Sequence, residues 1–181
     1  MPRTFAVTIA LVAMLMGGAA RATQDVTIAA FAGHWVGSGI ARSDLSEYFK
    51  MTLRDLDVIV TLKGDGFVIA WTTVLREGGT SDNPKVRRKS ATLDFVPAGR
   101  PGVFRDARGG VDPLSGAPYA WARIRGQTLT VHSLVIDDDG SYEMHSYDRT
   151  LVGAGMELEF TRVRDGEPTR TVSGKLIKSS Y

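Results

Sequence analysis

The chain has 181 residues, of which 43% are hydrophobic and 23% are charged; these values indicate one globular domain and exclude a disordered polymer. It contains no cysteine, so disulfides, thiolate metal sites and a cysteine nucleophile are excluded. The 22 basic and 20 acidic residues nearly balance, at a formal net charge of +2, and we therefore expect no nucleic-acid partner.

The N-terminal segment 1–22 has the pattern of a cleavable signal peptide. Arg3 is followed by the uncharged apolar run 5–16 and then by a small-x-small sequence at 20–22. The run is shorter than the roughly 20 residues of a membrane-spanning helix; a short buried helix or a retained anchor is the alternative. We expect a neutral domain at 23–181 that is periplasmic or secreted, without a cysteine for lipid attachment.

After one short helical turn near 27–32, apolar and polar residues alternate with period two, and no later segment keeps a helical period. Turn sequences such as Lys63-Gly64-Asp65-Gly66 and Arg164-Asp165-Gly166 separate the alternating runs, because glycine and a preceding aspartate adopt the left-handed backbone of tight hairpins. About ten strands are predicted, at residues 34–42, 48–62, 66–76, 85–96, 102–107, 118–125, 127–136, 141–151, 155–164 and 169–178.

This pattern predicts an all-β fold, a single closed up-and-down antiparallel β-barrel of about ten strands. Closure removes the two unpaired edges of a meander, whereas the alternative, a β-sandwich, needs longer crossings than these tight turns provide. In the second predicted strand, Phe49, Met51 and Leu53 share one face, but the apolar residues from Leu56 onwards have the opposite parity. This change of phase predicts a β-bulge between Leu53 and Leu56.

The first predicted strand contains Gly33, Trp35, Gly37 and Gly39 at alternate positions. A Gly-x-Trp after a short helical turn resembles the signature of calycins, the lipocalin-like barrels, and the longer glycine pattern is similar to the ten-stranded nitrobindin type. The resemblance, which extends to exported bacterial proteins of this barrel type, implies that Trp35 packs across the closed end and that the glycines let the strand coil. Nitrobindins hold haem through a histidine near the C-terminus, but residues 155–178 contain none, so we expect no cofactor.

Cations and aromatic residues supply candidate ligand contacts. Arg87 and Lys89 share a face with apolar residues of the same predicted strand. If that face is the interior, they meet an anionic head group such as a fatty-acid carboxylate, and the aromatic side chains of Trp71, Tyr119 and Trp121 hold its apolar part. The alternatives are a solvated strand end and aromatic side chains that only fill the core.

His132 and His145 lie on neighbouring predicted strands. If Ile136 pairs with Ser141, the two imidazoles face each other and form a candidate metal site with Glu143 nearby. A register shift of one residue breaks this pair.

No nucleophile elbow, zinc-protease motif or phosphate-binding glycine loop occurs in the sequence, and we do not expect an enzyme. We expect a barrel that binds a small apolar or amphipathic molecule in its interior. The alternative is a filled barrel that serves as a structural or interaction module of the cell envelope through long loops at 77–84 and 107–118. Integral membrane insertion is not expected, because Glu157 and Glu159 alternate with apolar residues in a way that favours a wet exterior.

Overall fold

The computed structural model describes residues 25–43, 52–76 and 86–180, and the predicted signal segment 1–22 lies outside them. The described residues form mainly strands, since their period-two alternation can bury only one face of an extended chain. The strands are β1 (Gly33–Ser43), β2 (Thr52–Lys63), β3 (Gly66–Arg76), β4 (Val86–Pro97), β5 (Val103–Asp106), β6 (Tyr119–Arg125), β7 (Thr128–Ile136), β8 (Tyr142–Val152), β9 (Gly155–Arg164) and β10 (Glu167–Lys178). The 3-10 helix η1 (Ile28–Phe31) precedes β1, and the 3-10 helix η3 (Pro113–Ser115) lies between β5 and β6.

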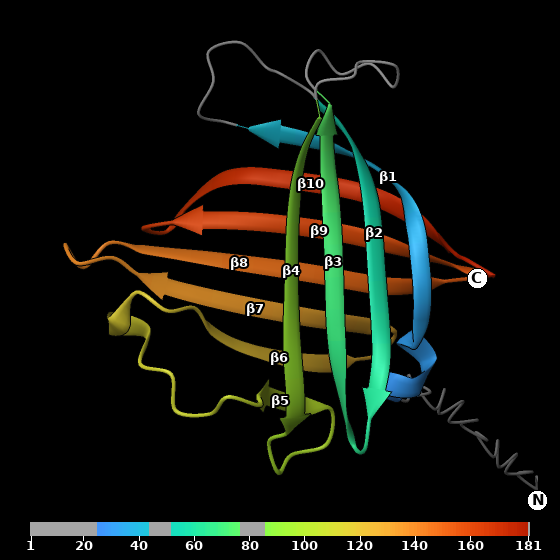
Figure 1. Ribbon diagram of the computed structural model, residues 1–181, viewed down its shortest axis with the longest axis horizontal. Helices are drawn as coiled ribbons and strands as arrows, with labels where there is room; N and C mark the ends of the chain where they lie inside the picture. The colour runs from blue at the N-terminus through green and yellow to red at the C-terminus, as the bar shows by residue number, and fades with distance from the viewer. Residues whose placement is uncertain (1–24, 44–51, 77–85, 181) are drawn as a thin grey trace, which may run out of the picture.

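Each strand pairs antiparallel with its neighbours in the sequence, and β1 also pairs with β10, so the sheet closes on itself (Figure 1). The predicted all-β, closed up-and-down barrel of ten strands is therefore confirmed, and the β-sandwich alternative is wrong. Of the two predicted long loops, 107–118 contains η3, whereas 77–84 lies outside the described residues. No helix in the described part of the chain has the length and apolar character needed to cross a membrane.

The hairpin between β9 and β10 shows how the sequence sets a turn. Asp165 and Gly166 both have positive φ, 49° and 88°. Two consecutive residues of positive φ match the right-handed twist of the flanking strands, and Asp and Gly tolerate this conformation better than other residues.

The glycine pattern of β1 allows β10 to approach closely. A Cβ atom on Gly37 would lie 1.9 Å from the Lys175 carbonyl oxygen, so a side chain at this position requires the backbone to move. Trp35 is buried, and its indole N–H donates a hydrogen bond of 2.9 Å to the Phe31 carbonyl of η1. Trp35 and Phe31 thus join η1 to the buried core of the barrel.

The half of the interior next to η1, here called the apolar half, is filled. Phe67 lies 5.1 Å, centroid to centroid, from both Phe95 and Phe104. The buried side chains of this core also include Val60, Ile69, Ile124, Leu129, Val131, Met156 and Leu176. The expectation of a filled core therefore holds for this half of the barrel.

The predicted bulge between Leu53 and Leu56 is wrong. β2 pairs with β1 and β3 without a register shift: Leu53 lies opposite the outward-facing Ile40, and Arg54 lies opposite Gly39 on the inner face. The apolar pattern changes phase because a buried arginine occupies an interior position that periodicity assigns to an apolar residue. The register shift that the structure does contain lies in β10, between Pro168 and Arg170.

Candidate functional site

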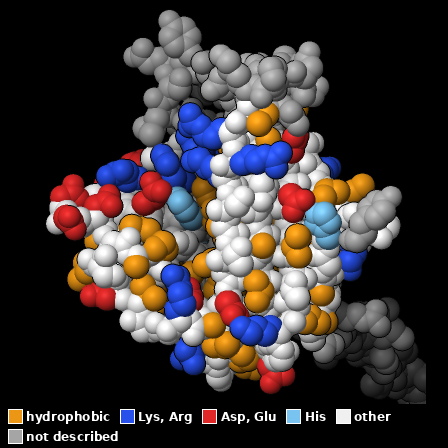
Figure 2. All heavy atoms as spheres, in the orientation of Figure 1, with side chains coloured by type: hydrophobic (Ala, Val, Ile, Leu, Met, Phe, Trp, Pro, Cys, Tyr) orange, Lys and Arg blue, Asp and Glu red, His pale blue; other side chains and the backbone are white. Residues whose placement is uncertain are grey.

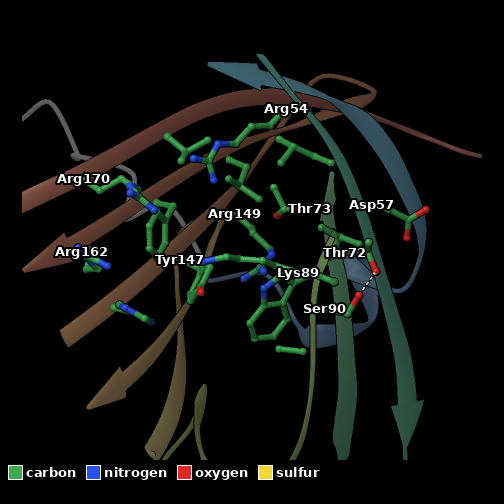
Figure 3. Close-up of a pocket in the computed structure, with 18 residues that line it drawn as sticks. Arg54, Asp57, Thr72, Thr73, Lys89, Ser90, Tyr147, Arg149, Arg162 and Arg170 are labelled. Atoms are coloured by element: carbon green, nitrogen blue, oxygen red, sulfur yellow. Dashed lines mark hydrogen bonds between the residues drawn. The ribbon is translucent and has the colours of Figure 1, made fainter. Parts of the chain in front are cut away.

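The other half of the interior contains a cavity of about 200 Å³ between β2, β3, β4, β8, β9 and β10. Drug-sized ligands occupy pockets of roughly 300–1,000 Å³, so this cavity suits a more compact molecule. Its apolar lining includes Leu56, Trp71, Tyr147, Leu158, Phe160 and Val172. Its basic lining consists of Arg54, Lys89, Arg149, Arg162 and Arg170, which reach the cavity from five different strands (Figure 3).

Arg149 is the central feature of the cavity. Strand alternation places it on the inner face of β8, in phase with Tyr147, and its side chain is fully buried. Its guanidinium carbon lies 5.5 Å from the Trp71 ring centroid and 5.4 Å from that of Tyr147. All three guanidinium nitrogens lack a hydrogen-bond partner. Burial lowers the pKa of Arg149 to about 10, so the group is still charged at neutral pH.

A buried charge without a hydrogen-bonded counter-charge is unfavourable, because the low-polarity interior replaces neither its hydration nor its hydrogen bonds. The two aromatic rings beside Arg149 supply part of the lost electrostatic stabilisation, but they accept none of its N–H hydrogen bonds. A carboxylate or phosphate group would supply both the charge and bidentate acceptors. The geometry around Arg149 is therefore chemically suited to an anion.

Apart from one carboxylate, the other charged side chains of the described lining are positive. Among the described lining residues the one carboxylate is Asp57, which lies on the outer face of β2 and contacts the His34 imidazole at 2.8 Å, away from the cavity (Figure 3). Lys and Arg side chains also gather on the surface around this half of the molecule (Figure 2). The cavity therefore combines an apolar wall with uncompensated positive charge.

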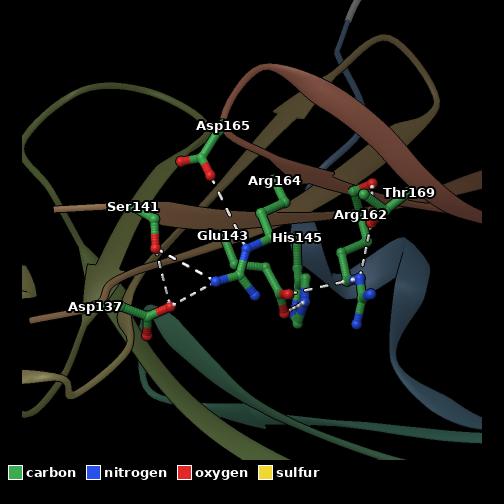
Figure 4. A network of polar contacts seen from close by, with 8 residues as sticks. All are labelled: Asp137, Ser141, Glu143, His145, Arg162, Arg164, Asp165 and Thr169. Atoms are coloured by element: carbon green, nitrogen blue, oxygen red, sulfur yellow. Dashed lines mark hydrogen bonds and ion pairs between the residues drawn. The ribbon is translucent and has the colours of Figure 1, made fainter. Parts of the chain in front are cut away.

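Arg162 differs from Arg149 in having partners. It donates a hydrogen bond of 2.9 Å to the Thr169 hydroxyl and lies 3.6 Å from Glu143, which in turn contacts the His145 imidazole at 2.7 Å (Figure 4). This half-buried network links β8, β9 and β10 at one edge of the cavity. Because Glu143 already neutralises Arg162, the network leaves the charge of Arg149 uncompensated.

The apolar wall is largely aromatic. The Trp71 and Tyr147 rings are 5.0 Å apart, and those of Tyr147 and Phe160 are 4.7 Å apart. Burial raises the pKa of the Tyr147 hydroxyl, so the group stays protonated at neutral pH and can donate a hydrogen bond. A planar or compact apolar group is complementary to such a wall.

Three of the residues proposed from the sequence line this cavity: Trp71 and Lys89, proposed as ligand contacts, and His145, proposed as a metal ligand. Arg87 lies on the same inner face of β4, opposite Leu75, but it is exposed and is not part of the lining. The structure thus brings one predicted aromatic residue and one predicted cation together.

Tyr119 and Trp121 do not belong to the cavity, and the prediction that they face the interior is wrong. The inner face of β6 carries Ala120, Ala122 and Ile124, whose small or apolar side chains are buried. The two aromatic residues occupy the alternate, outer positions, where Trp121 stacks on His132 at 4.7 Å.

The facing histidine pair is also wrong. Ile136 pairs with Tyr142 rather than with Ser141, and this difference of one residue places His132 opposite Ser146. His132 lies on the outer face and His145 on the inner face, so the two cannot share a metal ion. The part of the chain that the structure describes holds no cluster of His, Cys, Asp and Glu able to bind one.

The four arginines of the lining, Arg54, Arg149, Arg162 and Arg170, were not predicted from the sequence. A signal for all four exists, because each has the parity of the apolar residues on its strand, as in Arg54-x-Leu56, Phe160-x-Arg162 and Arg170-x-Val172. The irregularity of β10 lies between Pro168 and Arg170, so it leaves the parity from Arg170 onwards unchanged.

No family model matches the sequence, and no curated protein matches it. Among solved structures, the chain is similar to the S-type phycobiliprotein lyase CPES from Guillardia theta, with 8% identity, a TM-score of 0.39, and coverage of 86% of this chain and 94% of that one. It is also similar to the dehydratase domain from the terminal module of the rifamycin polyketide synthase, with 11% identity, a TM-score of 0.23, and coverage of 80% and 74%.

Proposed function

We propose that this barrel binds a small amphipathic molecule in its interior and holds the anionic group of that molecule with Arg149. The observation that carries the proposal is the fully buried guanidinium whose three nitrogens have no hydrogen-bond partner and which lies at the cavity. An anionic group would satisfy these donors, and the aromatic wall formed by Trp71, Tyr147 and Phe160 would contact the apolar part.

The filled apolar half limits the size of this molecule. Phe31, Phe67 and Phe95 are fully buried there and leave the ligand only the basic half of the barrel. The ligand is thus more compact than the long-chain fatty acid that a fully hollow barrel would accommodate.

The proposal is tested with pairs of molecules that share a skeleton and differ in charge: benzoate with benzyl alcohol, and hexanoate with hexanol. Isothermal titration calorimetry on the parent protein should show each carboxylate binding at least tenfold more tightly than its alcohol. Arg149→Met should weaken carboxylate binding at least tenfold and leave alcohol binding unchanged, because only the carboxylate uses the guanidinium.

Arg123→Met is the matched control, since Arg123 is exposed on the outer face of β6 and its loss changes the net charge equally. This variant should bind the carboxylates as the parent does. Equal affinities for acid and alcohol, or unchanged carboxylate binding by Arg149→Met, would refute an anion site at Arg149.

We also propose that the protein acts outside the cytoplasm. The support is the order of Arg3, the apolar run 5–16 and the small residues at 20 and 22. N-terminal sequencing of the exported protein, expressed from its full-length gene, should begin at Thr23. A cytoplasmic product that retains residues 1–22 would contradict this proposal.

A further inference from the structure

A second cationic centre lies beside Arg149 in the same cavity. Arg54 comes from β2 and Arg170 from β10, and β1 runs between these strands with Gly39 and Ala41 on its inner face. Both guanidinium groups line the cavity (Figure 3).

This second centre is also incompletely compensated. Arg54 is 8% exposed, and its Nε has no hydrogen-bond partner. The pKa of Arg54 is lowered first by burial and then by the charge of Arg170, so the two groups are close enough to repel each other. No described carboxylate on the inner face is placed to neutralise them, because Glu143 is held by His145 and Arg162.

An anionic group bound to Arg149 through two parallel hydrogen bonds uses both of its oxygens there, which favours a second group for Arg54 and Arg170. A guanidinium binds a carboxylate or phosphate through two parallel hydrogen bonds, and Arg149 reaches the cavity from β8, whereas Arg54 and Arg170 reach it from β2 and β10. With a cavity of about 200 Å³, a single compact molecule must carry both negative charges.

We infer that the ligand is a compact dianion, with one anionic group on Arg149 and a second, separate anionic group on Arg54 and Arg170. This inference rests on the proposed function and narrows its ligand class to molecules with two carboxylate or phosphate groups attached to a short apolar or aromatic body. A monoanion would leave one centre buried and uncompensated.

The test compares dianions with the monoanions obtained by blocking one group: adipate with monomethyl adipate, and terephthalate with monomethyl terephthalate. Calorimetric titrations at constant ionic strength should show the parent protein binding each dianion at least tenfold more tightly than its monoester. Arg54→Met should abolish this difference while monoester affinity stays within about twofold, and Arg54→Lys, which keeps the charge, should restore part of it.

The variants separate the two proposals. Arg149→Met should weaken both members of each pair, and Arg123→Met, on the outer face, should change neither beyond the effect of net charge. Equal binding of dianion and monoester by the parent, or an unchanged ratio in Arg54→Met, would overturn the dianion inference and leave the anion site at Arg149 standing. Failure of the parent protein to bind any of the four probes at millimolar concentration would overturn both. Thermal denaturation of each variant establishes that it is folded.

Discussion

The guanidinium carbon of Arg149 lies 5.5 Å from the centroid of the Trp71 ring, inside a barrel where the arginine is fully buried and its nitrogens have no hydrogen-bond partner. The contact holds the cation against an aromatic face and directs it to the cavity. It also means that the ligand-free protein keeps an uncompensated charge in its interior, which lowers its stability.

We therefore expect Arg149→Met to stabilise the ligand-free protein, by about 1–4 kcal/mol, as when apolar residues replace buried charged groups. The folded-state pKa of about 10 lies below the ordinary arginine value, so the cost of burial is fully present below pH 10 and falls only above it. Urea denaturation should consequently show the same increase in the free energy of unfolding of Arg149→Met over the parent at every pH between 6 and 9. Arg162→Met is the matched control and should not stabilise, because Glu143 loses its ion pair with Arg162 and Thr169 loses the hydrogen bond from the guanidinium. A destabilised Arg149→Met would contradict the cost assigned to this charge.

Gly37→Ala should destabilise the protein by at least about 2 kcal/mol, because overpacking of a tight contact forces the backbone to move. The added Cβ would lie 1.9 Å from the Lys175 carbonyl oxygen and 2.8 Å from the Leu176 Cα. Chemical denaturation measures the loss. Ser38→Ala, at the next and exposed position, should stay within about 0.5 kcal/mol of the parent, and an equal effect of both changes would rule out the contact as the cause.

Asp106 should contribute to stability at neutral pH and lose that contribution in acid. Hydrogen bonds from the Arg108 side chain, the shortest 2.7 Å, are the main cause that holds the pKa of Asp106 below its ordinary 3.8. A carboxyl group whose pKa is lower in the folded state stabilises that state at pH values above its pKa in the unfolded chain. This stabilisation is lost as the pH falls through the pKa of the folded state.

Asp106→Asn should thus cost about 1 kcal/mol at pH 7, a modest value because Arg108 is half-exposed and screened by solvent. Urea titrations at falling pH should show the parent and variant curves converging below pH 3.8. Asp65→Asn, in an exposed turn, serves as the control, and curves for Asp106→Asn and parent that run parallel into acid would contradict the prediction.

His132 should titrate below the ordinary histidine value of 6.5. Burial is the main cause that lowers its pKa, and the Arg123 charge lowers it further, against a smaller raising effect of Asp148. Because the folded protein binds this proton less readily than the unfolded chain, the free energy of unfolding is highest where both states hold a neutral imidazole. It falls as the pH drops below 6.5, the pKa of the unfolded chain.

An NMR titration of the imidazole proton resonances measures the pH midpoint of His132. The resonances are assigned by their loss in His132→Gln. Arg123→Gln should move the midpoint upwards, because one repelling charge is removed. A midpoint at or above 6.5 in the parent protein would be inconsistent with the burial described for this ring.

The barrel could be predicted because its evidence is local. Each hairpin is encoded by adjacent residues, as at Asp165 and Gly166, and the alternation of β3 from Phe67 to Trp71 defines its inner face directly. Closure followed from the need to pair both edges of the meander.

The site could be predicted only in part, because it depends on parity and on exact register. Tyr119 and Trp121 appeared suited to the interior, yet Ala120 and Ala122 occupy it, since the filled barrel has room there only for small side chains. A one-residue error in the register of β7 and β8 placed His145 opposite His132, on the outer face, whereas His145 lies on the inner face. Arg54 was not predicted, because a charged residue at an interior position interrupts the period-two alternation of apolar and polar residues.

The hydrogen-bonded seam between β1 and β10, from Trp35 to Ser43 on one side and from Arg170 to Lys178 on the other, has a kinetic consequence. β1 can pair with β2 early, but it cannot pair with β10 until β10 has left the ribosome. Closure of the barrel is therefore a late, long-range step of folding. During synthesis the edge of β1 stays available to other chains, and a chaperone that shields this edge would raise the yield of native protein.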